Sequence, residues 1–282
     1  MRERISPPLR RRQLGRLLRG LRVQQGLTLD QVAQRVGWSR SRVGKLETGE
    51  TRIGLGDLSR LLDVYEADKE TRLGFGRLAK QAYATPWWQP YKYGLDGLGE
   101  FVSLETEARR IRYWQPQLVP GQLQTMEYAQ AVLRSHYPWE DDLLITMRAR
   151  ARIARQWVTD CEDPVIVEAV IGEAALRHLV GGPQVMAGQL DALADAVSRP
   201  NIQIRVLPQS ASAHAGLSTG FLLLNVASMP EILFLESGVG GIIDQGPQVE
   251  EFTARFAHIA DSALSSGESV ELIAAIRRDI EC

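Results

Sequence analysis

Cysteine and long apolar runs are the features that this sequence has least of. Only Cys161 and Cys282 occur among its 282 residues. Such scarcity excludes a disulfide framework, and their separation does not fit a zinc site. No run of about 18 apolar residues is present, and the basic N-terminal stretch lacks the apolar core of a secretory signal. We therefore expect a cytoplasmic protein with no membrane-spanning segment.

The chain also lacks the local signatures of common enzymes. It contains no phosphate-binding glycine loop, dinucleotide fingerprint or nucleophile elbow. Its histidines show no i,i+4 pair of the kind that binds zinc. The side chains considered for acid–base chemistry, with no spacing that links them, are Glu168, Glu173, His178, His214, Glu236 and Asp244. We expect no enzymatic activity, no metal and no cofactor, and an enzymatic second half remains an alternative.

Charge is divided unevenly along the chain. Residues 1–60 carry 14 Lys/Arg against 5 Asp/Glu, a net charge of +9. The other residues carry 19 against 29, a net charge of −10, which together give the −1 of the whole chain. A small basic head on an acidic body is typical of a protein that binds a polyanion through its head. The alternative is a basic tail that is merely solvated.

Five short helices are predicted in the head by apolar periodicity and by residues typical of helix ends. Thr28 and Gln31 can form a capping box at the start of the second helix. Gly37 suits a left-handed turn after that helix, and Ser39 is a good N-cap for the third. The expected helices are 9–24, a second between Thr28 and Gly37, 40–47, 55–65 and 71–84.

The third helix has the side chains of a helix that reads DNA. Arg40, Ser41 and Lys45 lie opposite the apolar Val43 and Leu46 on a helix that begins at Arg40. A helix fits the major groove, where Arg and Lys donate hydrogen bonds to guanine O6 and N7. We therefore predict base contacts from Arg40, Ser41 and Lys45, against the alternative of a solvated helix face.

Phosphate contacts are predicted around the same helix. Ser39 caps a helix N-terminus whose free amides favour a nearby phosphate. Arg42 lies on the flank of the helix, and Arg52 follows it along the chain. Such contacts position a protein on the duplex without reading sequence.

The stretch LRGLRVQQGLTLDQVAQRVGWSRSRVGKLETGETRIGLGDLSRLLDVY resembles the Xre type of helix-turn-helix domain, as in the lambda and 434 repressors. The resemblance covers residues 12–68. It implies an ion pair between Arg22 and Glu47, a structural turn at Gly37 and a phosphate contact from Thr48. It also implies a homodimer on double-stranded DNA, with one recognition helix in each half-site.

The helical pattern breaks at ATPWWQP, so we predict a head of residues 1–84 and a body of residues 85–282. Segments rich in Val, Ile, Leu and Phe predict strands in the body, and the remaining periodic segments predict helices. The fold class is therefore multidomain: an all-α five-helix head followed by an α+β body with a small, mostly antiparallel sheet. Expected strands are 164–171, 201–206, 219–226 and 231–237; expected helices are 99–114, 121–135, 139–158, 172–180, 184–197, 246–265 and 267–280.

The passage from the Trp87-Trp88 pair through Val119-Pro120-Gly121 and Leu123-Gln124-Thr125 resembles the second domain of actinobacterial WhiJ-like, or toxin–antitoxin-like, antitoxin regulators. Gln122 stands where a leucine is usual. The resemblance implies transcription regulation and a small partner protein encoded nearby, or an unknown ligand, that binds the body. An antitoxin that mainly neutralises its partner is an alternative.

Two groups of side chains in the body have competing interpretations. Trp87, Trp88, Tyr91 and Tyr93 are a candidate partner or ligand surface, or they cement the junction between head and body. Three arginines share a face of the helix expected at 139–158, a pattern typical of a solvated, salt-bridged surface rather than an anion pocket. They are Arg148, Arg152 and Arg155.

Overall fold

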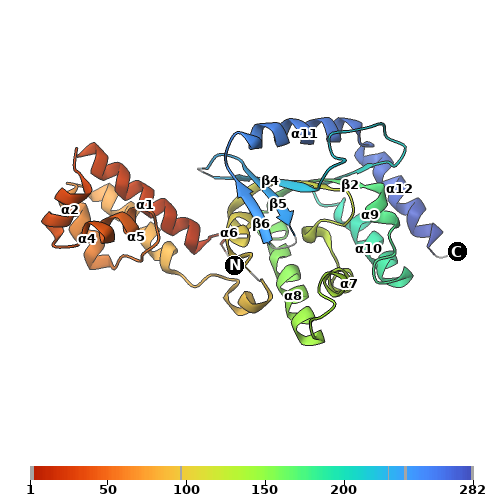
Figure 1. Ribbon diagram of the computed structural model, residues 1–282, viewed down its shortest axis with the longest axis horizontal. Coiled ribbons are helices and arrows are strands. Elements are labelled where there is room, and N and C mark those ends of the chain that lie inside the picture. Colours follow the sequence, from red (N-terminus) through yellow and green to blue (C-terminus); the bar gives the residue numbers. More distant parts are fainter. Residues whose placement is uncertain (1–2, 96, 228, 238–239, 281–282) are drawn as a thin grey trace. The chain divides into compact units, whose positions relative to one another are not determined.

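The computed structural model describes residues 3–95, 97–227, 229–237 and 240–280 (Figure 1). It divides into two compact units, Ile5–Gln89 and the remainder from Pro90, and Arg4 belongs to the second unit. The predicted boundary after residue 84 lies slightly earlier, so residues 85–89 group with the head. The chain therefore passes from body to head after Arg4 and returns after Gln89.

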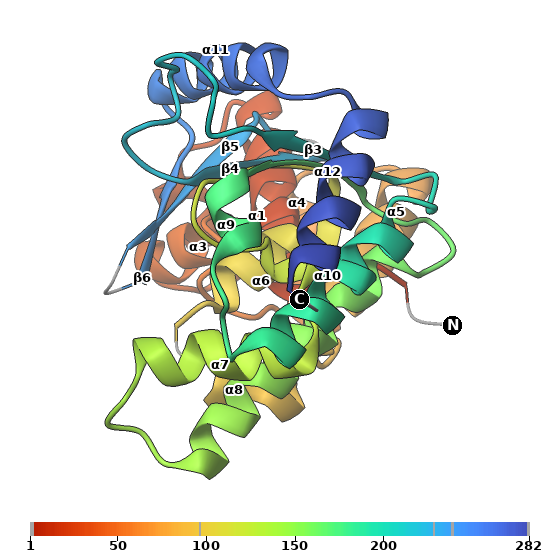
Figure 2. The same ribbon diagram turned by 90° about the vertical axis from the view of Figure 1, so that its right-hand side faces the viewer.

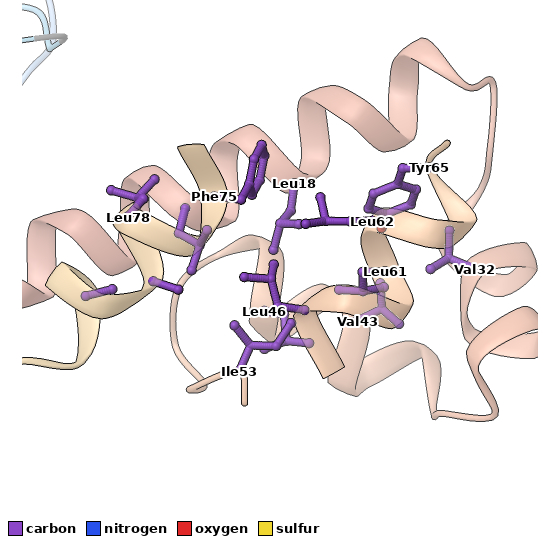
Figure 3. Packing of buried hydrophobic residues seen from close by; sticks show 14 of the residues in the cluster. Leu18, Val32, Val43, Leu46, Ile53, Leu61, Leu62, Tyr65, Phe75 and Leu78 are labelled. Atoms are coloured by element: carbon purple, nitrogen blue, oxygen red, sulfur yellow. The ribbon is translucent and has the colours of Figure 1, made fainter. Parts of the chain in front are cut away.

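The head is entirely helical. Its helices are α1 (Pro7–Gln24), α2 (Leu29–Val36), α3 (Arg40–Glu47), α4 (Leu55–Val64) and α5 (Lys69–Tyr83). Their apolar faces meet in one cluster of buried side chains, among them Leu18, Val32, Val43, Leu61 and Phe75 (Figure 3). The five predicted helices and the all-α class of the head are confirmed.

The helix ends of the head follow from the residues placed there. The Thr28 hydroxyl accepts from the Gln31 amide at 3.2 Å, and the Gln31 side chain accepts from the Thr28 amide at 2.8 Å. Gly37 has φ of 70°, which favours glycine because a β-carbon is strained there. Ser39 accepts from the Arg42 amide at 3.2 Å and begins α3. Capping and turn chemistry thus fix where α2 ends and α3 starts.

The body contains helices and strands in its first part, then four consecutive strands, and ends in two helices. Its helices are η1 (Gln89–Gly94), α6 (Gly99–Glu107), η2 (Gly121–Leu123), α7 (Met126–His136), α8 (Asp142–Arg155), η3 (Gln156–Thr159), α9 (Glu173–Arg177), α10 (Pro183–Ala196), α11 (Gln248–Ser262) and α12 (Ser266–Asp279). Its strands are β1 (Ala108–Gln115), β2 (Ile166–Gly172), β3 (Ile202–Leu207), β4 (Phe221–Val226), β5 (Ile232–Ser237) and β6 (Gly240–Asp244).

The strands form one mixed sheet of order β3-β2-β1-β4-β5-β6. Strands β1, β2 and β3 pair in parallel, whereas β1–β4, β4–β5 and β5–β6 pair antiparallel. Most pairings are thus antiparallel, as expected, and the α+β class of the body is confirmed. In Figures 1 and 2, α11 covers one face of the sheet, and α6, α7, α8 and α10 lie on the other.

One predicted helix was wrong in its second half. The segment 99–114 was expected to be helical throughout, but α6 ends at Glu107 and Ala108 begins β1. β1 lies between β2 and β4, with Ile111 and Tyr113 buried at 0% and 3% exposure. Pairing on both sides outweighs the helical tendency of the preceding residues. The short strand β6 was not predicted.

Arg4 is held by backbone carbonyls of the body. Its guanidinium donates to Thr106 O at 3.1 Å, to Asp163 O at 2.7 Å and to Ala108 O. Two of these acceptors lie at the C-terminal end of α6 and the start of β1, where a cation is favoured by the helix dipole. Burial lowers the pKa of Arg4 from its usual value.

Candidate nucleic-acid interface

The orientation of α3 leaves its charged face in solvent. Val43 and Leu46 point into the head core and are only 0% and 4% exposed. The predicted base-contacting residues Arg40, Ser41 and Lys45 are all exposed on the other side of the helix. The structure therefore presents these three side chains together, on one accessible helix face.

An ion pair fixes the C-terminal end of α3 to α1. Arg22 Nε donates to Glu47 Oε1 at 2.6 Å, and Arg22 Nη2 donates to Glu47 Oε2 at 2.9 Å. The two side chains are only 12% and 7% exposed, so the pair is weakly screened by solvent. The hydrogen bond to Glu47 raises the pKa of Arg22. Arg22 and Glu47 thus hold the C-terminal end of α3 against α1.

Close backbone packing adds to this anchor. A β-carbon on Gly15 would lie 2.5 Å from Glu47 O and 2.6 Å from Leu46 O, so only glycine fits this point of α1. After α3, Gly49 has φ of 77°, and its carbonyl accepts from Arg11 Nε at 2.8 Å. The angle of α3 is therefore set by contacts that leave little room for adjustment.

Arg42 is already engaged within the head. Its Nη2 lies 2.6 Å from Asp57 Oδ2, and its guanidinium stacks 4.1 Å from the centre of the Trp38 ring. Both members of the ion pair remain partly exposed, at 44% and 31%. The contacts of Trp38 and Asp57 with Arg42 were not predicted from the sequence, because neither residue lies in α3 with Arg42. The arrangement holds the guanidinium on the flank of α3, where a phosphate contact was predicted.

The other predicted contact residues surround α3 in solvent. Arg40 Nη1 lies 3.6 Å from Asp30 Oδ2, with both side chains about two-thirds exposed at 68% and 67%, so this pair restrains Arg40 little. Thr48 Oγ1 donates to Lys45 O at 3.2 Å and to Glu50 Oε1 at 2.8 Å. The exposed Thr48 hydroxyl thus hydrogen-bonds a backbone carbonyl of the last turn of α3.

Arg52 is placed by the last helix of the head. Its guanidinium lies 5.8 Å from the centre of the Tyr83 ring. The Tyr83 hydroxyl accepts from the Ile53 amide at 2.6 Å, and burial raises the pKa of Tyr83. The hydrogen bond from Ile53 to Tyr83 of α5 therefore fixes the backbone next to Arg52, whose side chain is exposed.

A cavity of about 240 Å³ opens between α1, the start of α2 and α3. Its lining contains Arg19 and Thr48 as exposed polar groups and Leu29 as an apolar wall. Sequence analysis did not identify it, because the lining residues come from three separate segments. The full lining is Arg19, Arg22, Leu29, Gly44, Glu47 and Thr48.

The aromatic residues predicted near the domain boundary differ in their exposure. Trp88 is buried, at 7% exposure, and meets Trp87 edge to face with ring centres 5.7 Å apart. Tyr91 is partly buried, whereas Tyr93 is 67% exposed beside Lys92. Among these four side chains, Tyr93 is therefore the one that is exposed to solvent.

Sequence analysis missed a more exposed tryptophan in the body. Trp139, between α7 and α8, is 77% exposed, and Leu143 in the first turn of α8 is 69% exposed. The neighbouring Tyr137 ring is held by the Arg148 guanidinium at 4.4 Å, and Arg148 donates to both oxygens of Glu140. A rigidly supported aromatic side chain in solvent is characteristic of a protein-binding surface.

The body arginines correct a second expectation. Arg148 and Arg155 are buried, at 9% and 8% exposure, rather than solvated. Arg155 donates to both oxygens of Glu105 at 2.8 and 2.9 Å, and Arg152 donates to Gln124 Oε1 at 3.0 Å. Arg148 and Arg155 are salt-bridged, as expected, but they stabilise the interior of the body.

Glu173 and His214, two of the residues considered for acid–base chemistry, are hydrogen-bonded within the body. Glu173 accepts from the Gln209 amide and Arg177, which lower its pKa against the opposing effect of burial. His214 Nδ1 accepts from the Gly216 amide at 3.1 Å. The side chains of Glu236 and Asp244 lie outside the described residues. Within the part of the chain that is described, no group of three His, Cys, Asp or Glu side chains could hold a metal ion.

Comparison with known proteins identifies the class to which the head belongs. Residues 13–73 match a helix-turn-helix domain. In such domains the second helix of the motif enters the major groove, and α3 is the corresponding helix of this chain. This match and the exposed face of α3 define the protein as a DNA-binding regulator.

The family is given by the body. Residues 98–275 match the domain of unknown function DUF5753, and because the match spans well over half of the chain, the protein belongs to this family. No curated protein and no solved structure matches the chain. Where the structure is described, no helix has both the length and the apolar character needed to cross a bilayer.

Proposed function

We propose that this protein is a sequence-specific transcriptional regulator that binds double-stranded DNA as a homodimer in the cytoplasm. The observation that carries the proposal is the exposed face of α3, with Arg40, Ser41 and Lys45 displayed on a helix fixed by the Arg22–Glu47 pair. A helix that reads DNA must be accessible and held at a constant angle, and α3 meets both conditions.

The residues divide into two roles in this proposal. Arg40, Ser41 and Lys45 contact base edges, since bidentate hydrogen bonds in the major groove distinguish base pairs. Ser39, Arg42, Thr48 and Arg52 contact phosphates on either side. Asp57 competes with a phosphate for Arg42, so binding exchanges one anionic partner for another. Asp30 likewise competes with DNA for the Arg40 guanidinium.

The body is proposed to regulate the head. It binds a small partner protein or a ligand, and its occupancy changes the spacing or orientation of the two heads of a dimer. Half-sites have a fixed separation, so a small shift would weaken operator binding. The resemblance to actinobacterial antitoxin-like regulators of the Xre type supports a repressor or an autoregulator. The acidic charge of the body is consistent with its standing away from DNA.

Neutralisation of a partner protein as the main activity is a second candidate. It is favoured by Trp139 and Leu143, which are exposed; the Trp139 ring stands edge-on to Tyr137 with the ring centres 6.1 Å apart. If the protein is chiefly an antitoxin, a small protein encoded nearby will co-purify with it, and Trp139→Ala will abolish that association while DNA binding persists. An enzyme with a DNA-binding head is the remaining alternative.

Genome-wide capture of DNA fragments by the purified full-length protein tests the proposal directly. We expect a small set of fragments that share an inverted repeat, with half-sites about one helical turn apart. Capture should be lost in the Arg40→Ala/Lys45→Ala double variant. Recovery of fragments without a common sequence would contradict sequence-specific regulation. Repeating the capture with the neighbouring small protein present distinguishes a partner that releases DNA from one that does not.

A further inference from the structure

The connection from β3 to β4, Pro208–Gly220, crosses one end of the sheet. β3 is an edge strand, and β4 lies beyond β2 and β1 in the strand order. The connection leaves β3 at its carboxyl end and enters β4 at Phe221, which pairs with Trp114 near the carboxyl end of β1. Open sheets with parallel strands bind ligands at this edge. We call Pro208–Gly220, drawn in teal beside α11 in Figure 1, the crossing segment.

A few hydrogen bonds attach the crossing segment. Trp114 Nε1 donates to Gly216 O at 2.9 Å, and the Gly216 amide donates to His214 Nδ1 at 3.1 Å. The His214 ring stands edge-on to Trp114 with the ring centres 5.6 Å apart. Nearer β3, the Gln209 amide donates to Glu173 Oε2 at 2.8 Å. The bond from Trp114 lies at the carboxyl end of β1, and the bond to Glu173 lies just after the carboxyl end of β2.

The inner side of the crossing segment contributes little apolar area. Ala211 and Ala215 are the side chains that pack, partly buried, against the cluster containing Trp114 and Phe221. Its largest apolar side chain, Leu217, is 71% exposed. Ordering the backbone of such a segment costs conformational entropy at every residue, and small side chains offset little of it. Segments of this kind open locally at far lower free energy than the strands they cover.

We propose that the crossing segment is a lid that opens while the sheet stays folded, and that it covers a ligand site with Trp114 as its floor. Opening frees the indole N–H, which then requires a hydrogen-bond acceptor in place of Gly216 O. The surrounding residues of this cluster are apolar and aromatic, including Phe221 and Phe252. The site therefore fits a flat, uncharged aromatic molecule that carries a carbonyl group. This assignment rests on the proposed role of the body as a ligand-binding unit.

Hydrogen exchange of the full-length protein, followed by mass spectrometry, tests the lid. Backbone amides of residues 209–219 should exchange at least about 100-fold faster than those of β1 and β4, through openings that low urea does not accelerate. Equal rates and equal urea dependence in the crossing segment and in β1 would show that it opens only with the whole body, and the lid would be excluded.

A glycine substitution sharpens this measurement. A β-carbon on Gly216 would lie 2.5 Å from Trp114 Cε2, so Gly216→Ala should lift the segment from the indole. We expect exchange in residues 209–219 to rise about tenfold while β1 and β4 keep their rates. Gly121→Ala is the control, because a β-carbon on Gly121 would have no neighbouring atom within 4 Å. Unchanged exchange in Gly216→Ala would overturn the proposed attachment to Trp114.

The ligand class is tested with coumarin, an uncharged aromatic carbonyl compound, against naphthalene, which has a similar shape and no acceptor. Millimolar coumarin should slow exchange in residues 209–219, and naphthalene should do so less. Equal effects would remove the role of the indole N–H, and no effect of coumarin on the native protein or on Gly216→Ala would exclude the site. Operator binding, measured separately without either probe, reports on the proposed DNA function and can fail independently.

Discussion

Arg40 on α3 of the head and Arg155 on α8 of the body have opposite surroundings. Arg40 keeps a side-chain exposure of 68%, with one loosely placed carboxylate 3.6 Å away. Arg155 is 9% exposed and donates to both oxygens of Glu105, whose side chain is 1% exposed. The first arginine is available to a polyanion, and the second already has its anion within the protein.

The difference lies in carboxylates contributed by other segments. Glu105 belongs to α6 and Glu140 precedes α8, so their pairing with Arg155 and Arg148 depends on how the body folds. The presence of arginines on a helix does not by itself distinguish an exposed basic face from side chains that form internal salt bridges. The head supplies fewer acidic partners, and its excess positive charge remains at the surface.

Breaking the Arg155–Glu105 ion pair of the body should have the largest effect on stability. Arg155→Leu leaves the Glu105 carboxylate buried without its cation, which should lower the free energy of unfolding of the body by about 3–5 kcal/mol. Urea unfolding followed by circular dichroism measures the loss. The Arg155→Leu/Glu105→Leu double variant should recover most of it, because the unpaired charge is gone. Arg40→Leu on α3 should change stability by no more than about 0.5 kcal/mol. A similar loss in Arg40→Leu would abolish the contrast between the two helices.

The anchoring of α3 can be broken without touching any charge. In Gly15→Ala the new methyl group overlaps backbone oxygens of Leu46 and Glu47, so α1 and α3 must separate. We expect a loss of about 1–3 kcal/mol in stability together with weaker operator binding. Gly20→Ala, on the same helix with nothing within 4 Å, should instead be neutral or slightly stabilising. Thermal unfolding and fluorescence anisotropy with operator DNA measure the two effects; equal behaviour of the variants would contradict the close packing.

Removing one cation of the head should weaken DNA binding selectively. Arg40→Ala should cost about 1–3 kcal/mol of operator affinity and relax preference at one base pair. Arg42→Ala should weaken all sequences alike and reduce the slope of log affinity against log salt by about 1. Arg150→Ala, an exposed arginine on α8, is the matched control and should leave binding unchanged. If the Arg40→Ala loss is uniform across sequences, Arg40 belongs with the phosphate contacts.

A smaller effect is expected from a buried amide in the body. Gln122 is 3% exposed, and neither polar atom of its side chain has a hydrogen-bond partner among the described residues. Gln122→Leu should therefore raise stability by about 1 kcal/mol. Gln189→Leu is the comparison, because Gln189 is fully buried and bonds both Thr125 N and Leu123 O. It should destabilise the body by about 2 kcal/mol, and a stability loss in Gln122→Leu would show that its amide is satisfied in solution.

The head could be predicted almost completely from its sequence because its structural signals are local. The capping box at Thr28, the turn at Gly37 and the cap at Ser39 each act within a few residues. The exposed face of α3 follows from helical period alone. The stacking of Arg42 on Trp38 and its pairing with Asp57 could not be predicted, since they depend on the meeting of α3 with neighbouring segments of the head.

The body was less predictable because its decisive contacts are distant in sequence. The residues of β1 continue a helical stretch without a break, and their strand conformation comes from pairing with β2 and β4. The exposure of Trp139 and the burial of Trp88 likewise depend on packing that composition does not reveal. Base-reading roles on α3 remain predictions that DNA-binding measurements can decide.

Arg4 belongs to the body, although it precedes the head in the sequence. Arg4 donates to carbonyl groups of Thr106, Ala108 and Asp163, although the rest of the body begins at Pro90. In topological terms, the helix-turn-helix head is inserted between Arg4 and Pro90 of the body. A recombinant fragment that begins at Pro90 will therefore lack a native donor to three backbone carbonyl groups of the body.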